Sequence, residues 1–120
     1  MTDSENYRLH TVPVTGGDLA VGVWGSQDAP VVLAVHGVTA SHRCWPLVAR
    51  DLPGLRIIAP DLRGRGRSNT LPGPFGMAQH ADDLARVLDG FGVDRALVLG
   101  HSMGAFASVV LADRHPSRVS

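Results

Sequence analysis

Residues 95–104 read RALVLGHSMG, an apolar run that ends at a serine set between two glycines. A helical pattern follows over residues 105–114, so the G-x-S-x-G sequence from Gly100 to Gly104 joins a predicted strand to a predicted helix. In a nucleophile elbow, such a sharp turn lifts the serine hydroxyl clear of the backbone. Glycine is needed on both sides because strand and helix come so close that larger side chains would clash. This position between two elements favours an elbow over a glycine-rich turn without chemistry.

The rest of the chain predicts strands that alternate with helices. Two runs joined around Gly16-Gly17-Asp18 predict an antiparallel hairpin at the N-terminus. The predicted strands cover residues 7–14, 19–24, 30–35, 55–59 and 96–99, and the predicted helices cover 41–52, 75–91 and 105–114. This order favours an α/β fold with a mostly parallel sheet after the hairpin. Chemistry in such sheets gathers at the carboxyl ends of the strands, which here carry His36-Gly37, Asp61 and Ser102.

Length and composition fit one small domain with a real core. The 120 residues are 44% hydrophobic and 18% charged, and 11 basic side chains balance 11 acidic ones. The sequence has no basic stripe for nucleic acid and no apolar run near the roughly 20 residues that cross a bilayer. The polar start over residues 1–6 does not read as a signal peptide, and the single cysteine, Cys44, rules out an internal disulfide. We therefore expect a soluble, cytoplasmic protein with no nucleic-acid or membrane partner.

Three segments, in this order, resemble the α/β-hydrolase superfamily. Residues 36–45, HGVTASHRCW, look like its His-Gly loop with a tryptophan opening the next helix. Residues 61–68, DLRGRGRS, are similar to the D-x-R-G-x-G-x-S loop of its esterases, carbon–carbon bond hydrolases and haloperoxidase-like members. Residues 100–104 form the third segment, the elbow. The similarity covers nearly all of the chain and implies the α/β-hydrolase fold.

The resemblance also implies roles for single residues. Ser102 would be the nucleophile that attacks a carbonyl carbon and carries the acyl group, and the backbone N–H groups of Val38 and Met103 would form the oxyanion hole. The supporting residues would be His36, which would fix the backbone at a strand end, and Gly37, Gly100, His101 and Gly104. A serine at the nucleophile position sets the chain apart from the haloalkane dehalogenase and epoxide hydrolase branches, which this superfamily builds on an aspartate.

The partners of the nucleophile are missing from the sequence. The superfamily supplies its triad in the order Ser, Asp or Glu, His, and only Asp113 and His115 follow Ser102 as candidates. A helical rise of about 1.5 Å per residue places them roughly 16–20 Å from the serine, too far for a base. We therefore interpret residues 1–120 as the N-terminal half of a single α/β-hydrolase domain, truncated before the sixth strand. On this interpretation, the cap and C-terminal half were removed, lie in a complementary chain or were never encoded. The superfamily's strand order places the strand over 96–99 inside the sheet, so without the second half we expect it to be an exposed apolar edge.

The expected function follows from these motifs. The parent protein would be a serine hydrolase that cleaves a small ester or related carbonyl substrate through an acyl-enzyme, without a cofactor or metal, and the 120-residue piece alone would be inactive. Within the enzymes, a cofactor-free haloperoxidase or perhydrolase and a carbon–carbon bond hydrolase stay open. The competing class is a non-catalytic, ligand-binding member or pseudoenzyme of the same fold.

Polar side chains outside the elbow have plain structural interpretations. Arg63 is expected to pair with Asp61 in a solvated loop. We expect His42 and His80 to lie on helices with their rings in solvent, and Cys44 to be a small buried side chain.

Overall fold

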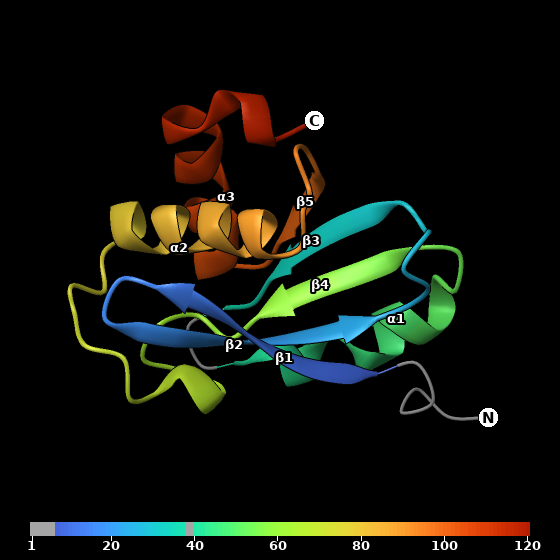
Figure 1. The fold of residues 1–120 in the computed structure, drawn as a ribbon, viewed down its shortest axis with the longest axis horizontal. Coiled ribbons are helices and arrows are strands. Elements are labelled where there is room, and N and C mark those ends of the chain that lie inside the picture. The colour runs from blue at the N-terminus through green and yellow to red at the C-terminus, as the bar shows by residue number, and fades with distance from the viewer. Residues whose placement is uncertain (1–6, 38–39) are drawn as a thin grey trace.

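The computed structural model describes residues 7–37 and 40–120, which form one five-stranded sheet flanked by helices (Figure 1). The strands are β1 (Arg8–Val14), β2 (Gly17–Trp24), β3 (Val31–Val35), β4 (Arg56–Pro60) and β5 (Leu97–Gly100). The α-helices are α1 (Pro46–Asp51), α2 (Met77–Gly90) and α3 (Met103–Arg114), and short 3₁₀ turns are η2 (His42–Cys44), η3 (Gly66–Ser68) and η4 (Pro116–Arg118). Each predicted strand is present, within one or two residues of its expected bounds.

The sheet is mixed, with the strand order β1-β2-β4-β3-β5. Antiparallel pairing joins β1 to β2 and β2 to β4, whereas β3 runs parallel to both β4 and β5. The predicted hairpin is confirmed: Val14 pairs with Gly17 across a turn in which Gly16 has a φ of 91°. Because β3, β4 and β5 are parallel neighbours, their carboxyl ends lie at one edge of the sheet.

Helices cover both faces of this sheet: α2 and α3 lie together on one face and α1 lies on the other (Figure 1). The side chains of strand β3 explain why both faces of the sheet are covered. They alternate, so that Leu33 and Val35 join the core with α2 and α3, while Val32 and Ala34 join the core with α1. A strand that is buried on both faces needs a continuous apolar run, which is the pattern that the sequence has here.

The helices differ from their predicted bounds where proline or glycine intervenes. The helix expected over residues 41–52 is split into η2 and α1, because Pro46 has no N–H and begins a new helix at its first position. Ser41 does cap this region, since its hydroxyl accepts the N–H of Arg43 at 3.2 Å. Helix α2 ends at Gly90, and Gly92 follows with a φ of 67°. Among the described residues, no helix combines the length and apolar character needed to cross a membrane.

Strand β5 is the apolar edge that the sequence predicts. Leu97 and Leu99 are 57% and 41% exposed. The far side of β5 is paired at a single point, where Ala96 bridges Val119 in parallel orientation. Ala96 donates its N–H to the carbonyl oxygen of Arg118 and accepts the N–H of Ser120, both at 3.0 Å. The end of the described chain therefore runs beside β5 in the direction that a further parallel strand would take.

Candidate active site

Ser102 lies at the turn between β5 and α3 in a strained backbone conformation. Its φ of 55° and ψ of −118° make it the only non-glycine residue with a positive φ in the described part of the chain. Such a conformation costs about 1–3 kcal/mol and persists only where surrounding structure enforces it. The side chain makes no capping hydrogen bond to α3, and the residue is exposed. The backbone therefore holds the hydroxyl out at the carboxyl end of β5.

The two glycines of the elbow are required by close backbone contacts. A Cβ on Gly100 would lie 2.6 Å from the Cα of Ala105, and a Cβ on Gly104 would lie 2.6 Å from the carbonyl oxygen of His36 and closer still to that of Val35. The N–H of His101 donates to the oxygen of Val35 at 3.0 Å, which ties the turn to the neighbouring strand. These contacts confirm the steric reason for the two glycines.

The start of the His-Gly loop packs against the elbow. A Cβ on Gly37 would lie 3.4 Å from the Cβ of Ser102 and 3.2 Å from Nδ1 of His101. Met103 is the first residue of α3, where an amide has no partner within the helix and the helix dipole favours negative charge. Val38, the other predicted oxyanion donor, lies outside the described residues, so its role stays a prediction.

His36 fixes the backbone at the end of β3. The N–H of Leu62 donates to its Nε2 at 2.9 Å, which leaves the proton on Nδ1, and Nδ1 donates to the oxygen of Gly37 at 2.6 Å. The side chain is fully buried, and this burial lowers the pKa of the imidazole below its ordinary value of 6.5. His36 is therefore a neutral structural link between the His-Gly loop and the residue after Asp61.

Asp61 does not pair with Arg63, which corrects the expected ion pair. Its Oδ1 accepts the backbone N–H and Nδ1–H of His42, and its Oδ2 accepts the N–H of Arg67 at 2.8 Å. Burial alone would raise the pKa of this carboxyl, but the hydrogen bonds from His42 and Arg67 hold it below the ordinary 3.8. Asp61 is thus a buried carboxylate that joins two loops.

Arg63 is buried rather than solvated. Its guanidinium binds both oxygens of Asp83 on α2, with Nε and Nη2 each at 2.9 Å. It also donates to the carbonyl oxygens of Pro72 and Thr15, at 2.8 and 2.7 Å. A planar group with five donors can bind several such acceptors at once, so Arg63 joins the loop after β4 to α2 and to the hairpin turn.

The expected exposure of three further side chains, His42, His80 and Cys44, was also wrong, although His80 does lie on a helix as expected. His42 and His80 are buried, at 1% and 0% exposed, because His42 faces Asp61 and His80 lies on the same side of α2 as the core residues. Cys44 is exposed, since the short η2 turn presents it to solvent. Sequence reasoning missed His42 as a partner of the strand-end residue Asp61. The available signal was that the His-Gly loop and Asp61 end neighbouring parallel strands.

Among the described residues, none forms a hydrogen bond to the hydroxyl of Ser102, so none is placed as its base. His115 lies beyond the last residue of α3, about 18 Å along the helix from its start, and its Nε2 binds Oδ1 of Asp82 at 3.0 Å. The rings of His36 and His42 are held by the partners described above. In residues 7–37 and 40–120, no three His, Cys, Asp or Glu side chains are grouped to hold a metal ion.

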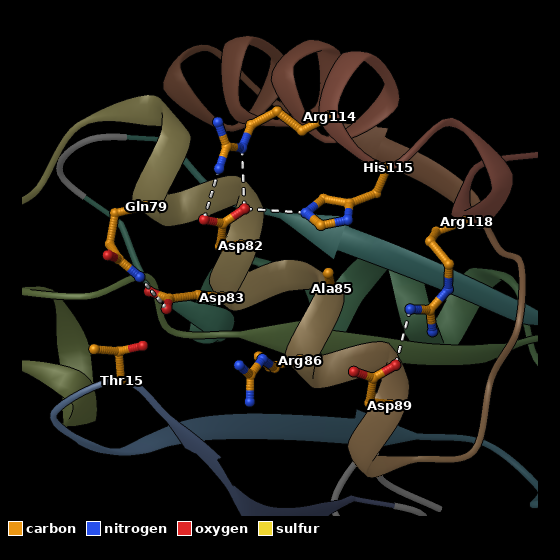
Figure 2. A pocket seen from close by; sticks show the side chains of 10 residues that line it. All are labelled: Thr15, Gln79, Asp82, Asp83, Ala85, Arg86, Asp89, Arg114, His115 and Arg118. Atoms are coloured by element: carbon orange, nitrogen blue, oxygen red, sulfur yellow. Dashed lines mark hydrogen bonds and ion pairs between the residues drawn. The ribbon is translucent and has the colours of Figure 1, made fainter.

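A polar cavity of about 390 Å³ lies at the opposite end of α3 from Ser102 (Figure 2). Ion pairs cross it: Arg114 binds Asp82 with Nε and Nη2 at 3.0 and 2.9 Å, and Arg118 binds Asp89 at 2.8 Å. These pairs tie α2 to the C-terminal end of α3 and to η4. The cavity is not the candidate active site, because none of the elbow residues lines it.

Comparison with known proteins identifies the family. A family profile described as the alpha/beta hydrolase fold matches residues 30–120. Lipase LipV of Mycobacterium tuberculosis is 38% identical over 103 residues, which cover 86% of this chain and 39% of that protein. A haloalkane dehalogenase of Bradyrhizobium diazoefficiens is 37% identical over 93% of this chain and 36% of its own length. A solved structure described as a membrane phospholipase A has a TM-score of 0.87 and 30% identity over 95% of this chain and 37% of that one.

The chain spans between 36% and 39% of the length of these proteins. Their names share hydrolysis but differ in the bond that is cleaved, so the similarity supports a hydrolase without selecting a substrate. The strand order, the strained serine between β5 and α3 and the match over residues 30–120 agree with one another. This chain belongs to the alpha/beta hydrolase fold family.

Proposed function

We propose that this chain carries the nucleophile of a serine hydrolase that cleaves a small ester or related carbonyl substrate. The observation that carries the proposal is the strained, exposed Ser102 with Gly37 packed against it. A serine also supports acyl transfer over dehalogenation, since the dehalogenase branch uses an aspartate at this position. The similarity to a protein named as a lipase supports an ester substrate.

The reaction follows from the position of the hydroxyl. Ser102 Oγ forms a bond to the carbonyl carbon, and its proton passes to a base and then to the leaving alcohol as the ester C–O bond breaks. The oxyanion formed in between requires donors about 3 Å away. The proposed donors are the N–H groups of Met103 and Val38. Water then attacks the acyl-enzyme and restores the free serine.

The proposal takes the acid and the base from polypeptide outside these 120 residues. Two observations support this. The rings of His36, His42 and His115 are hydrogen-bonded to groups other than Ser102. In addition, β5 presents Leu97 and Leu99 at an exposed edge. The bridge between Ala96 and Val119 supports docking of the missing half along β5. We further place the enzyme in the cytoplasm, where an exposed thiol such as Cys44 stays reduced, and cell fractionation tests this.

Labelling with a fluorophosphonate tests the nucleophile in the complete hydrolase. The proposal expects covalent labelling that disappears in Ser102→Ala and persists in Ser108→Ala, whose hydroxyl instead bonds the oxygen of Gly104 at 2.7 Å. A folded, complete protein that is not labelled would support the competing function, a ligand-binding member without catalysis. The 120-residue piece alone should show no turnover of p-nitrophenyl acetate. Turnover by that piece that is lost in Ser102→Ala would refute an external base.

A further inference from the structure

Both ends of the His-Gly loop are anchored to two consecutive residues after β4. At its start, Nε2 of His36 accepts the N–H of Leu62. At its end, the backbone and ring of His42 both donate to Oδ1 of Asp61. The loop between these anchors begins at Gly37, which packs against Ser102. The position of Asp61-Leu62 therefore determines where both ends of the loop stand relative to the nucleophile.

The second end is held by the contact between two buried side chains, His42 and Asp61, and the half-buried Tyr7 lies on the far side of the His42 ring. Nδ1 of His42 donates to Asp61 at 2.8 Å, and Nε2 of His42 lies 2.7 Å from the hydroxyl of Tyr7. In the neutral ring, Nδ1 is the donor and Nε2 accepts the Tyr7 proton, so the carboxylate selects one tautomer. The ring also stacks on Tyr7, with an interplanar angle of 6°. Since both ring nitrogens are used and the side chain is buried, this Asp–His pair cannot act as a base for Ser102.

The contacts of Gly66 show that Asp61 is also packed tightly within its own loop, the one that follows β4. A Cβ at this position would lie 2.6 Å from Cγ of Asp61 and 2.9 Å from Cβ of Ser41. Gly66 has a φ of 52°, and the next residue, Arg67, donates its N–H to the other oxygen of Asp61. Asp61 therefore lies between the backbone of its own loop and His42. Because Asp61 is fixed in this way, its hydrogen bonds also fix the position of His42 at the end of the His-Gly loop.

We propose that Asp61 and His42 form a positioning pair for the proposed reaction: they hold the His-Gly loop in register with Ser102 without touching substrate. The inference rests on the proposed serine hydrolase. Oxyanion donors act only when they are fixed near 3 Å, and a misplacement of about 1 Å can cost about 100-fold in rate. A loosened loop should therefore lower kcat while substrate affinity changes little.

Two substitutions of His42 separate the two hydrogen bonds of the ring. His42→Asn keeps an N–H donor near the place of Nδ1 and loses the link to Tyr7. His42→Gln keeps an acceptor near the place of Nε2 and loses the ring donor to Asp61. The assay is hydrolysis of p-nitrophenyl acetate by the complete hydrolase, with kcat expressed per fluorophosphonate-titratable site so that only folded, competent molecules count. Tyr7→Phe is the matched control.

The proposal expects kcat of His42→Asn and Tyr7→Phe within about 3-fold of the parent, and kcat of His42→Gln lower by about 10-fold or more, with KM within about 2-fold. Asp61→Asn is the second variant, and it should show the same fall in kcat at constant KM. Equal kcat in His42→Asn and His42→Gln, or kcat and KM that change together, would overturn the positioning pair. The proposed function fails separately, if Ser102→Ala keeps the parent rate.

Discussion

The guanidinium of Arg63 binds both carboxylate oxygens of Asp83 at 2.9 Å, and both side chains are almost completely buried. This ion pair connects the loop that carries Asp61 to α2, and further donation to Thr15 and Pro72 connects it to the hairpin turn. The loop that begins at Asp61 is therefore held by two sets of contacts, the ion pair of Arg63 with α2 and the hydrogen bonds of Asp61 with His42.

Removing Arg63 should strongly destabilise the fold. Arg63→Ala leaves the buried Asp83 carboxylate without its ion-pair partner and with only the amide of Gln79 as a side-chain donor, at 3.0 Å. Such a loss costs about 3–5 kcal/mol. Arg63→Lys should recover only part of this free energy, because one ammonium cannot bind Asp83, Thr15 and Pro72 together. Equilibrium denaturation measures both. Arg114→Gln is the control: its pair with Asp82 is largely exposed, so the denaturation midpoint should hardly move. Equal midpoints for Arg63→Ala and Arg114→Gln would contradict the claim that the buried ion pair contributes more stability than the exposed one.

A methyl group at Gly104 should prevent correct assembly of the elbow. The added Cβ would overlap the carbonyl oxygens of Val35 and His36, which belong to the backbone and cannot rotate away. We expect Gly104→Ala to yield little soluble protein or a strongly lowered melting temperature. Gly54→Ala provides the comparison, because a Cβ there meets nothing within 4 Å. Equal melting temperatures for the two variants would mean that α3 and the end of β3 are not as close as described.

Replacing Ser102 by glycine should stabilise the fold and at the same time remove the hydroxyl. Ser102 has a φ of 55°, which glycine adopts without the steric cost that a Cβ brings. We expect Ser102→Gly to be about 1 kcal/mol more stable than Ser102→Ala, because only glycine relieves the strain. Chemical denaturation of the two inactive variants measures the difference. An alanine variant at least as stable as the glycine variant would mean that the turn is not strained.

Stability should fall as the pH drops below about 6.5. Burial lowers the pKa of His36 and of His80, so the unfolded chain takes up protons at these rings at a higher pH than the folded chain does. The stability contributed by the two neutral rings is then fully present above pH 6.5 and is lost as the pH falls toward the lower pKa of the folded state. Asp61, whose pKa is also lowered, contributes stability that is lost only below its ordinary 3.8, outside this window.

His80→Leu should make this pH dependence shallower. Both ring nitrogens of His80 are buried without a hydrogen-bond partner in the described structure, so leucine removes a proton-binding site without breaking a bond. Denaturation midpoints at pH 7.5 and pH 5 measure the slope. An unchanged slope in His80→Leu would assign the effect to other groups.

Local patterns in the sequence predicted most of the fold. The apolar runs placed the strands, and the elbow was predicted because a small-residue turn between strand and helix has one steric explanation, which the contacts of Gly100 and Gly104 confirm. The apolar edge at β5 was instead expected from the resemblance, because the superfamily's strand order places this strand inside the sheet, and the exposure of Leu97 confirms it.

The polar partners could not be predicted in the same way. Asp61 meets His42 across 19 positions and Arg63 meets Asp83 across 20, and neither spacing has a local signature. Charged and imidazole side chains were assigned to solvent because most of them lie there, whereas these are buried with specific partners. A strand-end position identified Asp61 as a member of the site region, but only the packed structure identifies the group that it binds.

Locating the covalent adduct by tandem mass spectrometry, after the complete hydrolase reacts with a fluorophosphonate, tests the central claim most directly. The account predicts one phosphonylated peptide, with the added mass on Ser102. An adduct on another residue, or no adduct on a folded protein that hydrolyses esters, would contradict it.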